Sequence, residues 1–324
     1  MKIPLLQTKE WEKLQKDLGE ETFFESEKDF QYLAILKHTK FGNYLYLPYG
    51  PVLHTKDAYK KALKSLQELS EKKSVIFIRI EPQSPENARE WLKSPKIKRS
   101  KELNPAHTWL LDLKTDKDVM IKNFTQGTRT CYNQTPKKGL SILSTKNPEK
   151  IKELVRLQSK LAKEKGINAF SEKYLKTELE QPFASLYLVV YNPINDQSLE
   201  DESKKINDPK IIAASLFFDD EDTRYYMQSA SDYDYRRLPA TVGLLTSAIF
   251  DAKEKGLKYF DFWGIAPDDA PKDHPWAGFT KFKKSFGGFP VEYCGTYDYV
   301  LKPAKYKLYN LARKANLKIR KLKA

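Results

Sequence analysis

The sequence of 324 residues contains only two cysteines and four histidines, and this scarcity excludes several kinds of site. Cys131 and Cys294 lie far apart without a CxxC pair, so neither a disulfide framework nor a metal-ligand pattern is expected. The first residues lack the apolar core of a signal peptide, and no apolar run reaches membrane-spanning length. These absences favour a reduced, cytoplasmic protein that holds no metal.

Acidic residues are outnumbered, with 43 Asp and Glu against 57 Lys and Arg, which gives a formal net charge of +14. Such an excess attracts nucleic acid, nucleotide phosphates or an anionic membrane face. Residues 302–324 contain nine basic residues and no acid, and apolar residues recur there at helical spacing, at 308, 312, 315, 319 and 322. This pattern predicts a terminal helix that docks on the protein, contacts a polyanion, or does both.

The order of the expected elements occurs twice along the chain. Each half reads as helix, successive strands, helix and short buried strand. The first half gives helices at 8–19 and 55–73 and strands at 21–27, 32–40, 43–53 and 75–82. The second gives helices at 148–166, 171–181 and 239–256, and strands at 184–192, 210–220, 223–232 and 259–264.

This repeat predicts an α/β (α+β) fold of two like domains side by side, each a mixed sheet flanked by helices. We assign residues 1–105 plus 292–324 to the first domain and 106–291 to the second. The polar segment 192–210 interrupts two strands and is expected to form a mobile hairpin loop.

Glycine is scarce where a coenzyme would require it. The strand–strand–loop–helix–strand order resembles the GNAT-type N-acyltransferase fold, in which a Gly-rich loop holds the coenzyme A pyrophosphate through backbone N–H groups. The corresponding loop here is SDYDYRRLPATVG, with the single glycine Gly243 and with Pro239, which has no N–H to donate. An acyl donor other than acetyl-CoA is therefore expected.

Several segments resemble the FemABX family of peptidoglycan-bridge aminoacyltransferases, in family order over nearly the whole chain. They include YYMQSASDYDYRRLPA, YFDFWGI, FTKFKKSFGG and VEYCGTYDYVL, preceded by LLQTKEWEKLQ, YGPVL and FIRIEP. No long helical hairpin is expected, so the chain resembles the shorter members without a coiled-coil arm. The resemblance implies two GNAT-like domains, no cofactor, and transfer of an amino acid from aminoacyl-tRNA to an amine of a peptidoglycan precursor.

The resemblance also implies a role for FTKFKKSFGG, where lysines alternate with phenylalanines. Phe282 and Lys283 match the family position at which a lysine stabilises the oxyanion formed from the ester carbonyl. Phenylalanines limit screening of that charge by water. On strand alternation, Lys281 and Lys284 face the tRNA acceptor end or solvent. The alternative is a basic edge strand whose lysines reach solvent.

Two carboxylates are further candidates near the chemistry. Glu81 follows a buried strand at a family carboxylate position, where it orients or deprotonates the attacking amine, whose pKa is roughly 10 when free. The substrate's own carboxylate could equally take this proton, and the alternative for Glu81 is an ion pair with Arg79 or a lysine. Asp261 ends a buried strand and either positions Lys283 or caps the turn at Gly264.

The substrate contacts implied by the resemblance are partly altered in this chain. Tyr174 and Tyr226 match tyrosines of the family's substrate cleft, with core packing as the alternative for each. A family lysine is replaced by Gln15 and a family arginine by Phe170. Flanking or nearby cations are expected to substitute for them, namely Lys13, Lys16, Arg224, Arg236 and Arg237.

Three functions therefore remain open from the sequence. The first is the aminoacyl-tRNA-dependent enzyme, acting as a monomer on a soluble or lipid-linked precursor, with possible peripheral contact with the inner membrane face. The second is a GNAT-like N-acyltransferase with another donor or acceptor. The third is a non-catalytic module that binds tRNA or membrane through its basic tail.

Overall fold

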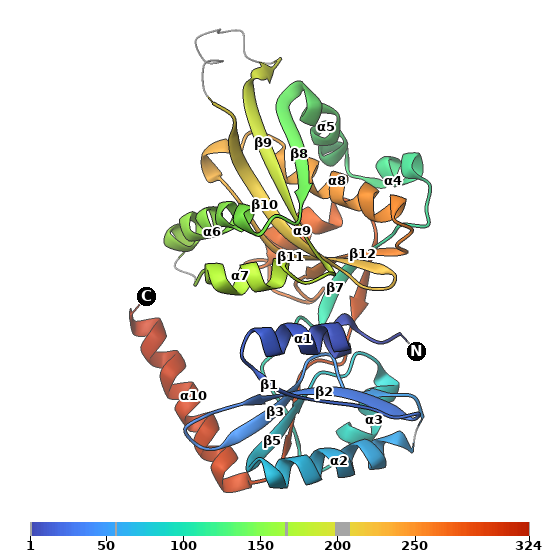
Figure 1. Ribbon diagram of the computed structural model, residues 1–324, viewed down its shortest axis with the longest axis vertical. Coiled ribbons are helices and arrows are strands. Elements are labelled where there is room, and N and C mark those ends of the chain that lie inside the picture. The colour runs from blue at the N-terminus through green and yellow to red at the C-terminus, as the bar shows by residue number, and fades with distance from the viewer. Residues whose placement is uncertain (1, 56, 166–167, 198–207, 324) are drawn as a thin grey trace. The chain divides into compact units, whose positions relative to one another are not determined.

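The computed structural model describes residues 2–55, 57–165, 168–197 and 208–323, which form two compact units. Unit 1 comprises Met1–Ala106 with Glu292–Ala324, and unit 2 comprises His107–Val291. Each unit contains a seven-stranded mixed sheet with helices packed against it (Figure 1). The predicted α/β fold with two helix-flanked mixed sheets is confirmed.

Unit 1 has the sheet order β1-β2-β3-β5-β14-β6, and β4 pairs with β2. Only β3 and β5 run parallel among the register pairs of this sheet. The strands are β1 (Glu21–Ser26), β2 (Phe30–Lys37), β3 (Asn43–Leu47), β4 (Val52–Leu53), β5 (Val75–Ile80), β6 (Ile97–Arg99) and β14 (Tyr297–Val300). The helices are α1 (Lys9–Asp17), α2 (Ala58–Lys72), α3 (Pro85–Leu92) and α10 (Pro303–Lys323).

The local sequence explains where helix α1 begins and which side of helix α2 packs on the sheet of unit 1. Helix α1 begins after Thr8, whose hydroxyl caps the helix by accepting a hydrogen bond from the Trp11 N–H at 3.2 Å. Helix α2 turns Ala58, Ala62 and Leu66 onto the sheet, where all three are fully buried. The spacing of four residues between them places these side chains on one face of the helix.

The terminal helix α10 docks through tyrosines instead of the predicted aliphatic face. The Tyr306 hydroxyl donates to Asp298 at 2.9 Å, and the Tyr309 ring lies 5.1 Å from that of Phe77. Leu308, which the periodicity placed on the docked face, is 52% exposed. That prediction is wrong because the larger tyrosine rings reach the sheet. The side chains of residues 319 and 322 lie outside the described part of the chain.

Unit 2 has the sheet order β13-β7-β12-β11-β10-β9-β8. Its strands are β7 (His107–Asp112), β8 (Lys138–Thr145), β9 (Ala184–Asp196), β10 (Lys210–Asp219), β11 (Thr223–Ser231), β12 (Tyr259–Gly264) and β13 (Phe289–Glu292). Its helices are α4 (Lys117–Asn123), α5 (Gln126–Gln134), α6 (Ile151–Lys165), α7 (Glu172–Leu179), α8 (Ala240–Glu254) and α9 (Ala277–Lys284). The expected loop at 192–210 is partly strand, because β9 continues to Asp196, and residues 198–207 lie outside the described range.

Helices cover both faces of the sheet in unit 2 (Figure 1). Tyr187 and Val189 of β9 pack in one core cluster with Leu245 of α8. Leu186 and Leu188 alternate with them and are fully buried on the opposite face. Helices α6 and α7 contact the sheet at β10, β11 and β9. The strand β11 therefore ends between two helical layers, which is where the candidate site lies.

Candidate active site

Helix α9 carries the alternating lysines and phenylalanines of FTKFKKSFGG. Phe279, Phe282 and Phe286 are three and four residues apart, which favours one side of a helix. Phe286 is fully buried, and its ring centroid lies 5.4 Å from those of Phe282 and Phe124. The strand alternation predicted for this segment is therefore wrong, because phenylalanine packing at helical spacing stabilises a helix.

The half-buried side chain of Lys283 extends from α9 to strands β11 and β12. Its Nζ donates a hydrogen bond to the Gly264 carbonyl oxygen at 2.6 Å and lies 6.0 Å from the ring centroid of Tyr226. Burial lowers the pKa of Lys283 to about 8, and the nearby Asp261 carboxylate opposes this shift. The group is therefore mostly a cation at pH 7, held in one place with limited access to water.

The end of β12 has an irregular backbone that presents this carbonyl. Trp263 adopts a positive φ of 64°, and the pairing of β12 with β7 shifts register between Asp261 and Gly264. The buried Asp261 carboxylate accepts hydrogen bonds from the Trp263 N–H at 2.7 Å and from the Thr108 hydroxyl. Asp261 thus stabilises the turn before Gly264, and its negative charge also acts on Lys283. Both roles considered from the sequence, capping the turn and positioning Lys283, are compatible with these contacts.

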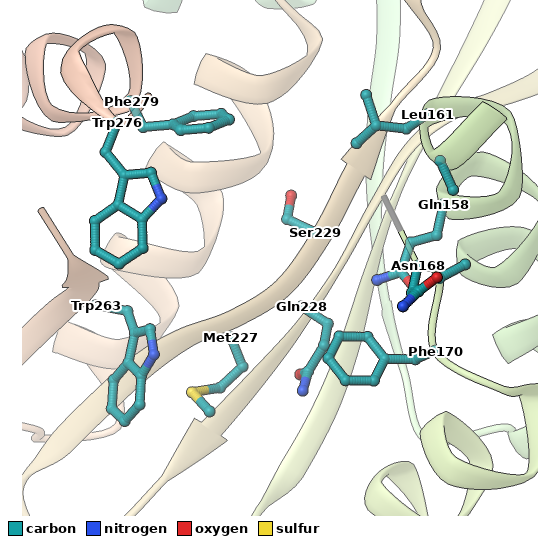
Figure 2. Close-up of a pocket in the computed structure, with 12 residues that line it drawn as sticks. Gln158, Leu161, Asn168, Phe170, Met227, Gln228, Ser229, Trp263, Trp276 and Phe279 are labelled. Carbon is teal, nitrogen blue, oxygen red and sulfur yellow. The ribbon is translucent and has the colours of Figure 1, made fainter. Parts of the chain in front are cut away.

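A cavity of about 520 Å³ lies beside α9 and β11, and we call it the aromatic–amide cavity. Figure 2 shows Trp263, Trp276 and Phe279 on one side, with Gln158 and Phe170 on the other. Met227, Gln228 and Ser229 of β11 lie between these walls. The lining contains no Lys, Arg, His, Asp or Glu side chain among the described residues. Aromatic rings and uncharged amides are typical of a site for a sugar, a peptide or a weakly hydrated cation.

A second cavity, of about 500 Å³, adjoins α9 and the start of α8, and we call it the cationic cavity. Arg236 and Lys281 supply its positive charge, and Phe282 and Thr128 also line it. The Arg236 guanidinium lies 4.4 Å from the ring centroid of Tyr233. Arg237 is exposed and does not line this cavity. Trp276 and Phe279 line the aromatic–amide cavity, and Gly278 and Lys281 line the cationic cavity, so the start of helix α9 contributes to both.

The two predicted tyrosines lie near the aromatic–amide cavity without lining it. The Tyr226 hydroxyl donates to Ser229 Oγ at 2.8 Å, and burial raises the pKa of Tyr226. Tyr174 stacks on Phe170 at 5.1 Å between ring centroids, and burial raises its pKa as well. Each tyrosine therefore supports a residue of the cavity wall, and direct substrate contact stays a prediction.

Arg224 was predicted to contact substrate, and the structure places it in the core of unit 2. Its side chain is fully buried and forms ion pairs with Asp219 and Asp251, each at 2.6 Å. It also donates to the Tyr187 hydroxyl and the Ala248 carbonyl oxygen, both at 2.9 Å. A guanidinium with these partners has no exposed edge for a phosphate, so the prediction for Arg224 is wrong. The alternating pattern of β11 could not reveal two carboxylates supplied by β10 and α8.

Glu81 lies in unit 1, where its carboxylate is buried and accepts several hydrogen bonds. Oε2 accepts from the Tyr46 hydroxyl at 2.7 Å and the Asn104 amide at 2.9 Å. Oε1 accepts from the Thr296 hydroxyl at 2.8 Å and from the Leu103 and Asn104 N–H groups. These contacts stabilise unit 1, and the role as proton acceptor stays a prediction.

The alternative of an Arg79–Glu81 ion pair is wrong. Arg79 is almost fully buried and binds Asp298 through two hydrogen bonds, of 2.7 and 2.9 Å. Bidentate pairing fixes the guanidinium in a plane that uses both carboxylate oxygens of Asp298.

The two lysines predicted to replace a family lysine are on the surface of α1. Lys13 pairs with Asp17 at 2.6 Å, and Lys16 pairs with Glu12 at 2.8 Å. Gln15 between them is buried. Exposed pairs of this kind exchange readily, so phosphate binding by Lys13 or Lys16 stays a prediction.

The structure brings four further residues to the aromatic–amide cavity or its wall that were not predicted from the sequence: Glu178, Gln228, Trp263 and Trp276. Glu178 follows Tyr174 by four residues on a predicted helix, so its position beside that tyrosine was readable. Its pairing with Gln228 of β11 was not, because it depends on how α7 packs on the sheet. Among the described residues, no group of three or more His, Cys, Asp and Glu side chains could hold a metal ion.

The fold of the chain is similar to that of two solved structures of acyltransferase-like proteins. The structure matches a crystal structure of FemX with a TM-score of 0.81 at 19% identity, covering 94% of each chain. It matches a tandem GNAT protein from the clavulanic acid biosynthesis pathway with a TM-score of 0.51 at 10% identity, covering 83% of this chain and 78% of that one. No helix in the described part of the chain is long and apolar enough to cross a membrane.

Residues 194–314 match the model of the FemAB family. A lipid II:glycine glycyltransferase of Staphylococcus haemolyticus is 36% identical over 105 residues, which cover 31% of this chain and 25% of that protein. The protein of the same name from Staphylococcus aureus is 28% identical over 176 residues, which cover 53% of this chain and 42% of that protein. The chain therefore matches less than half the length of these two relatives.

Proposed function

We propose that the protein transfers an amino acid from aminoacyl-tRNA to an amine of a peptidoglycan precursor, using the site in unit 2. We further propose that units 1 and 2 act as its two GNAT-like domains. Similarity to lipid II:glycine glycyltransferases supports the acceptor class and an acyl-transfer reaction. The single observation that carries the proposal is Lys283, a half-buried cation on the helix that contributes to both a cationic cavity and an uncharged one.

The two cavities suit the two substrates of such a reaction. Arg236 and Lys281 favour the phosphates at the acceptor end of tRNA in the cationic cavity. The aromatic–amide cavity has no cation for a phosphate and suits the peptide of the precursor. Each substrate then approaches α9 through its own cavity, and the reacting atoms meet near Lys283.

In this mechanism the acceptor amine, in its neutral form, attacks the carbonyl carbon of the aminoacyl ester. A C–N bond forms, and the carbonyl oxygen becomes an oxyanion that the Lys283 ammonium stabilises more strongly than the uncharged ester. The C–O bond to the ribose then breaks, the ribose oxygen takes up a proton, and the amine nitrogen loses one. Asp261 and the Gly264 carbonyl hold Lys283 in position during these steps.

The start of helix α8 argues against coenzyme A as the donor carrier. Its N-cap residue is Pro239, which has no N–H, and the preceding residues form a short 3₁₀ helix in place of a glycine loop. Gly243 lies inside α8, where an added Cβ would approach the Thr135 side chain within 2.6 Å, so this glycine permits packing.

We expect acetyl-CoA to bind weakly or not at all, because the segment before α8 has no glycine and Pro239 has no N–H to donate to a pyrophosphate. Isothermal titration calorimetry with acetyl-CoA should give no saturable heat at tens of micromolar ligand. Stoichiometric, tight binding would contradict the choice of donor.

The lowered pKa of Lys283 gives a second expected result. The ratio of wild-type to Lys283→Arg turnover should fall about tenfold between pH 7 and pH 9, because the lysine loses its proton near pH 8 and the arginine does not. Taking the ratio cancels the ionisation of the acceptor amine, which both enzymes share. A ratio that rises with pH would mean that neutral Lys283 acts as a base.

The proposed function is tested by incubating the protein with a complete set of charged tRNAs and UDP-MurNAc-pentapeptide or its lipid-linked form. Mass spectrometry of the precursor should show the added mass of one or more amino acids, and this mass identifies the donor. A precursor of unchanged mass in both forms would contradict the proposal.

A further inference from the structure

Helix α10 has apolar side chains on two sides, and the fold of unit 1 uses only one of them. The helix contacts β5, with Tyr306 and Tyr309 turned toward the sheet (Figure 1). Leu308 and Leu311 are 52% and 56% exposed. Two leucines on adjacent turns of one helix therefore remain in contact with water after unit 1 has folded.

The exposed leucines belong to a continuous apolar stripe. At about 100° per residue, positions three and four apart lie on one side of a helix, here the side opposite the two tyrosines. All four residues on that side are exposed. We call them the outward stripe: Ala304, Leu308, Leu311 and Ala315.

Lysines lie along both edges of the outward stripe. Helical geometry places Lys305 on one edge and Lys307 and Lys314 on the other, and all three are exposed. None of them forms an ion pair with a residue in the described part of the chain. Residues 302–324 contain nine basic residues and no acid, so the charge along this helix has one sign.

This combination of charge and apolar surface selects the partner. Two copies of the helix packed stripe to stripe would bring their lysines together and repel each other. RNA would neutralise the lysines but would leave the leucines in water. An anionic lipid bilayer offers phosphates for the lysines and acyl chains for the leucines, as amphipathic helices at a membrane surface require.

The tyrosine contacts prepare the helix for such a surface. The Tyr306 hydroxyl donates to Asp298, and the Tyr309 ring packs on Phe77, so the protein itself holds α10 against unit 1. A helix that is already formed does not lose the conformational entropy of folding when it meets the bilayer.

We propose that the outward stripe of α10 binds to the surface of an anionic lipid bilayer. Leu308 and Leu311 enter the boundary between headgroups and acyl chains, and the flanking lysines contact lipid phosphates. This contact goes beyond the proposed function, because transfer to a soluble precursor requires no membrane.

The test uses the full-length protein and sedimentation with lipid vesicles, without tRNA or precursor. One set of vesicles contains phosphatidylglycerol and phosphatidylcholine in equal parts, and the other contains phosphatidylcholine alone. The protein should bind the anionic vesicles at least tenfold more tightly. This preference should shrink between about 0.05 and about 0.5 M salt, because salt screens exposed charges.

The leucines are tested by the double variant Leu308→Ser with Leu311→Ser. It should bind the anionic vesicles about tenfold more weakly, because it removes the apolar surface that the bilayer buries. Its unfolding temperature should stay that of the wild type, since both side chains are exposed. The matched control is Leu92→Ser with Leu143→Ser, at leucines 43% and 46% exposed elsewhere on the protein, which should keep wild-type affinity.

The lysines are tested by Lys307→Gln with Lys314→Gln. This variant should lose about tenfold or more in affinity for the anionic vesicles, because each lysine near an anionic surface contributes about fivefold. Lys60→Gln with Lys64→Gln on α2 is the control, since it removes the same charge from exposed positions of another helix in unit 1. It should bind within about twofold of the wild type if the place of the charge matters more than the net charge.

Three results would overturn the proposal. The first is equal affinity of the wild-type protein for the two kinds of vesicle. The second is wild-type vesicle binding by the leucine variant together with weaker tRNA binding by the lysine variant, which would make α10 an RNA surface. The third is a dimer in light scattering that the leucine variant abolishes, which would assign the outward stripe to a second copy of the chain.

Discussion

Replacing Lys283 by methionine should lower the turnover of transfer by a hundredfold or more, with folding and precursor binding nearly unchanged. Methionine keeps the length and much of the aliphatic packing of the lysine but cannot stabilise an oxyanion. Loss of one such electrostatic contact costs about 3–4 kcal/mol, which corresponds to a rate factor on the order of 10²–10³. Steady-state kinetics with saturating substrates measures this effect as a change in kcat.

The matched control for this prediction is Lys258→Met. Lys258 is exposed and precedes β12 at the end opposite Gly264, so its loss removes a positive charge of the same kind from the same strand region. It should leave kcat within about twofold of the wild-type value, because exposed charges are strongly screened. Near wild-type turnover of Lys283→Met would show that Lys283 has no role in the chemistry.

The second large effect is expected at Arg224. Replacing this arginine by methionine should lower the free energy of unfolding of unit 2 by about 3 kcal/mol, since it leaves the half-buried Asp219 and Asp251 carboxylates without their cation. In a unit of this size the unfolding midpoint should fall by about 10 °C. Thermal unfolding followed by circular dichroism measures the shift.

Arg236→Met supplies the contrast, because Arg236 is exposed and lines the cationic cavity. Its replacement should leave the unfolding temperature unchanged and weaken tRNA binding. The opposite result would be an Arg224→Met protein that unfolds at the wild-type temperature but binds tRNA more weakly. This result would support a phosphate contact by Arg224, as predicted from the sequence, and would contradict its role in the core of unit 2.

The sequence correctly predicted those elements whose residues are mostly apolar and buried. The strand predicted over 75–82 is observed as β5 (Val75–Ile80), where five of the six residues are apolar and all six are buried. Helix α8 is bounded by Pro239 and Gly256 and rich in apolar residues, and it lies where expected, at Ala240–Glu254. In both cases the local composition favours the same secondary structure as the packing in the folded protein, so the local pattern was sufficient for the prediction.

Prediction from the sequence failed where partners come from distant segments. The segment over 277–284 is short, and its lysines masked the helical spacing of its phenylalanines. The charge on Arg224 suggested a surface position, although carboxylates from β10 and α8 bury it completely. Helices α3, α4 and α5 are short, with seven to nine residues each, and were not predicted.

The candidate site shows the same division. Lys283, Tyr226 and Asp261 were named from the sequence, and the structure brings them to one place at the ends of β11 and β12. Glu178 and Gln228 were not, because a hydrogen bond between a helix and a strand 50 residues apart leaves no local pattern. The resemblance indicated Lys283 as a candidate, whereas the cavities beside it depend on the three-dimensional packing of α9 and could not be predicted.

The most direct test of the account follows one labelled amino acid from tRNA to precursor in a single turnover. The protein is mixed in excess with tRNA charged with the amino acid identified by mass spectrometry, carrying a radioactive label, together with the precursor. We predict that the label leaves the RNA and appears on the precursor in equal amounts, that ribonuclease pretreatment abolishes transfer, and that Lys283→Met slows it at least a hundredfold. Label that stays on the RNA with active wild-type protein, or transfer at an unchanged rate by Lys283→Met, would contradict the account.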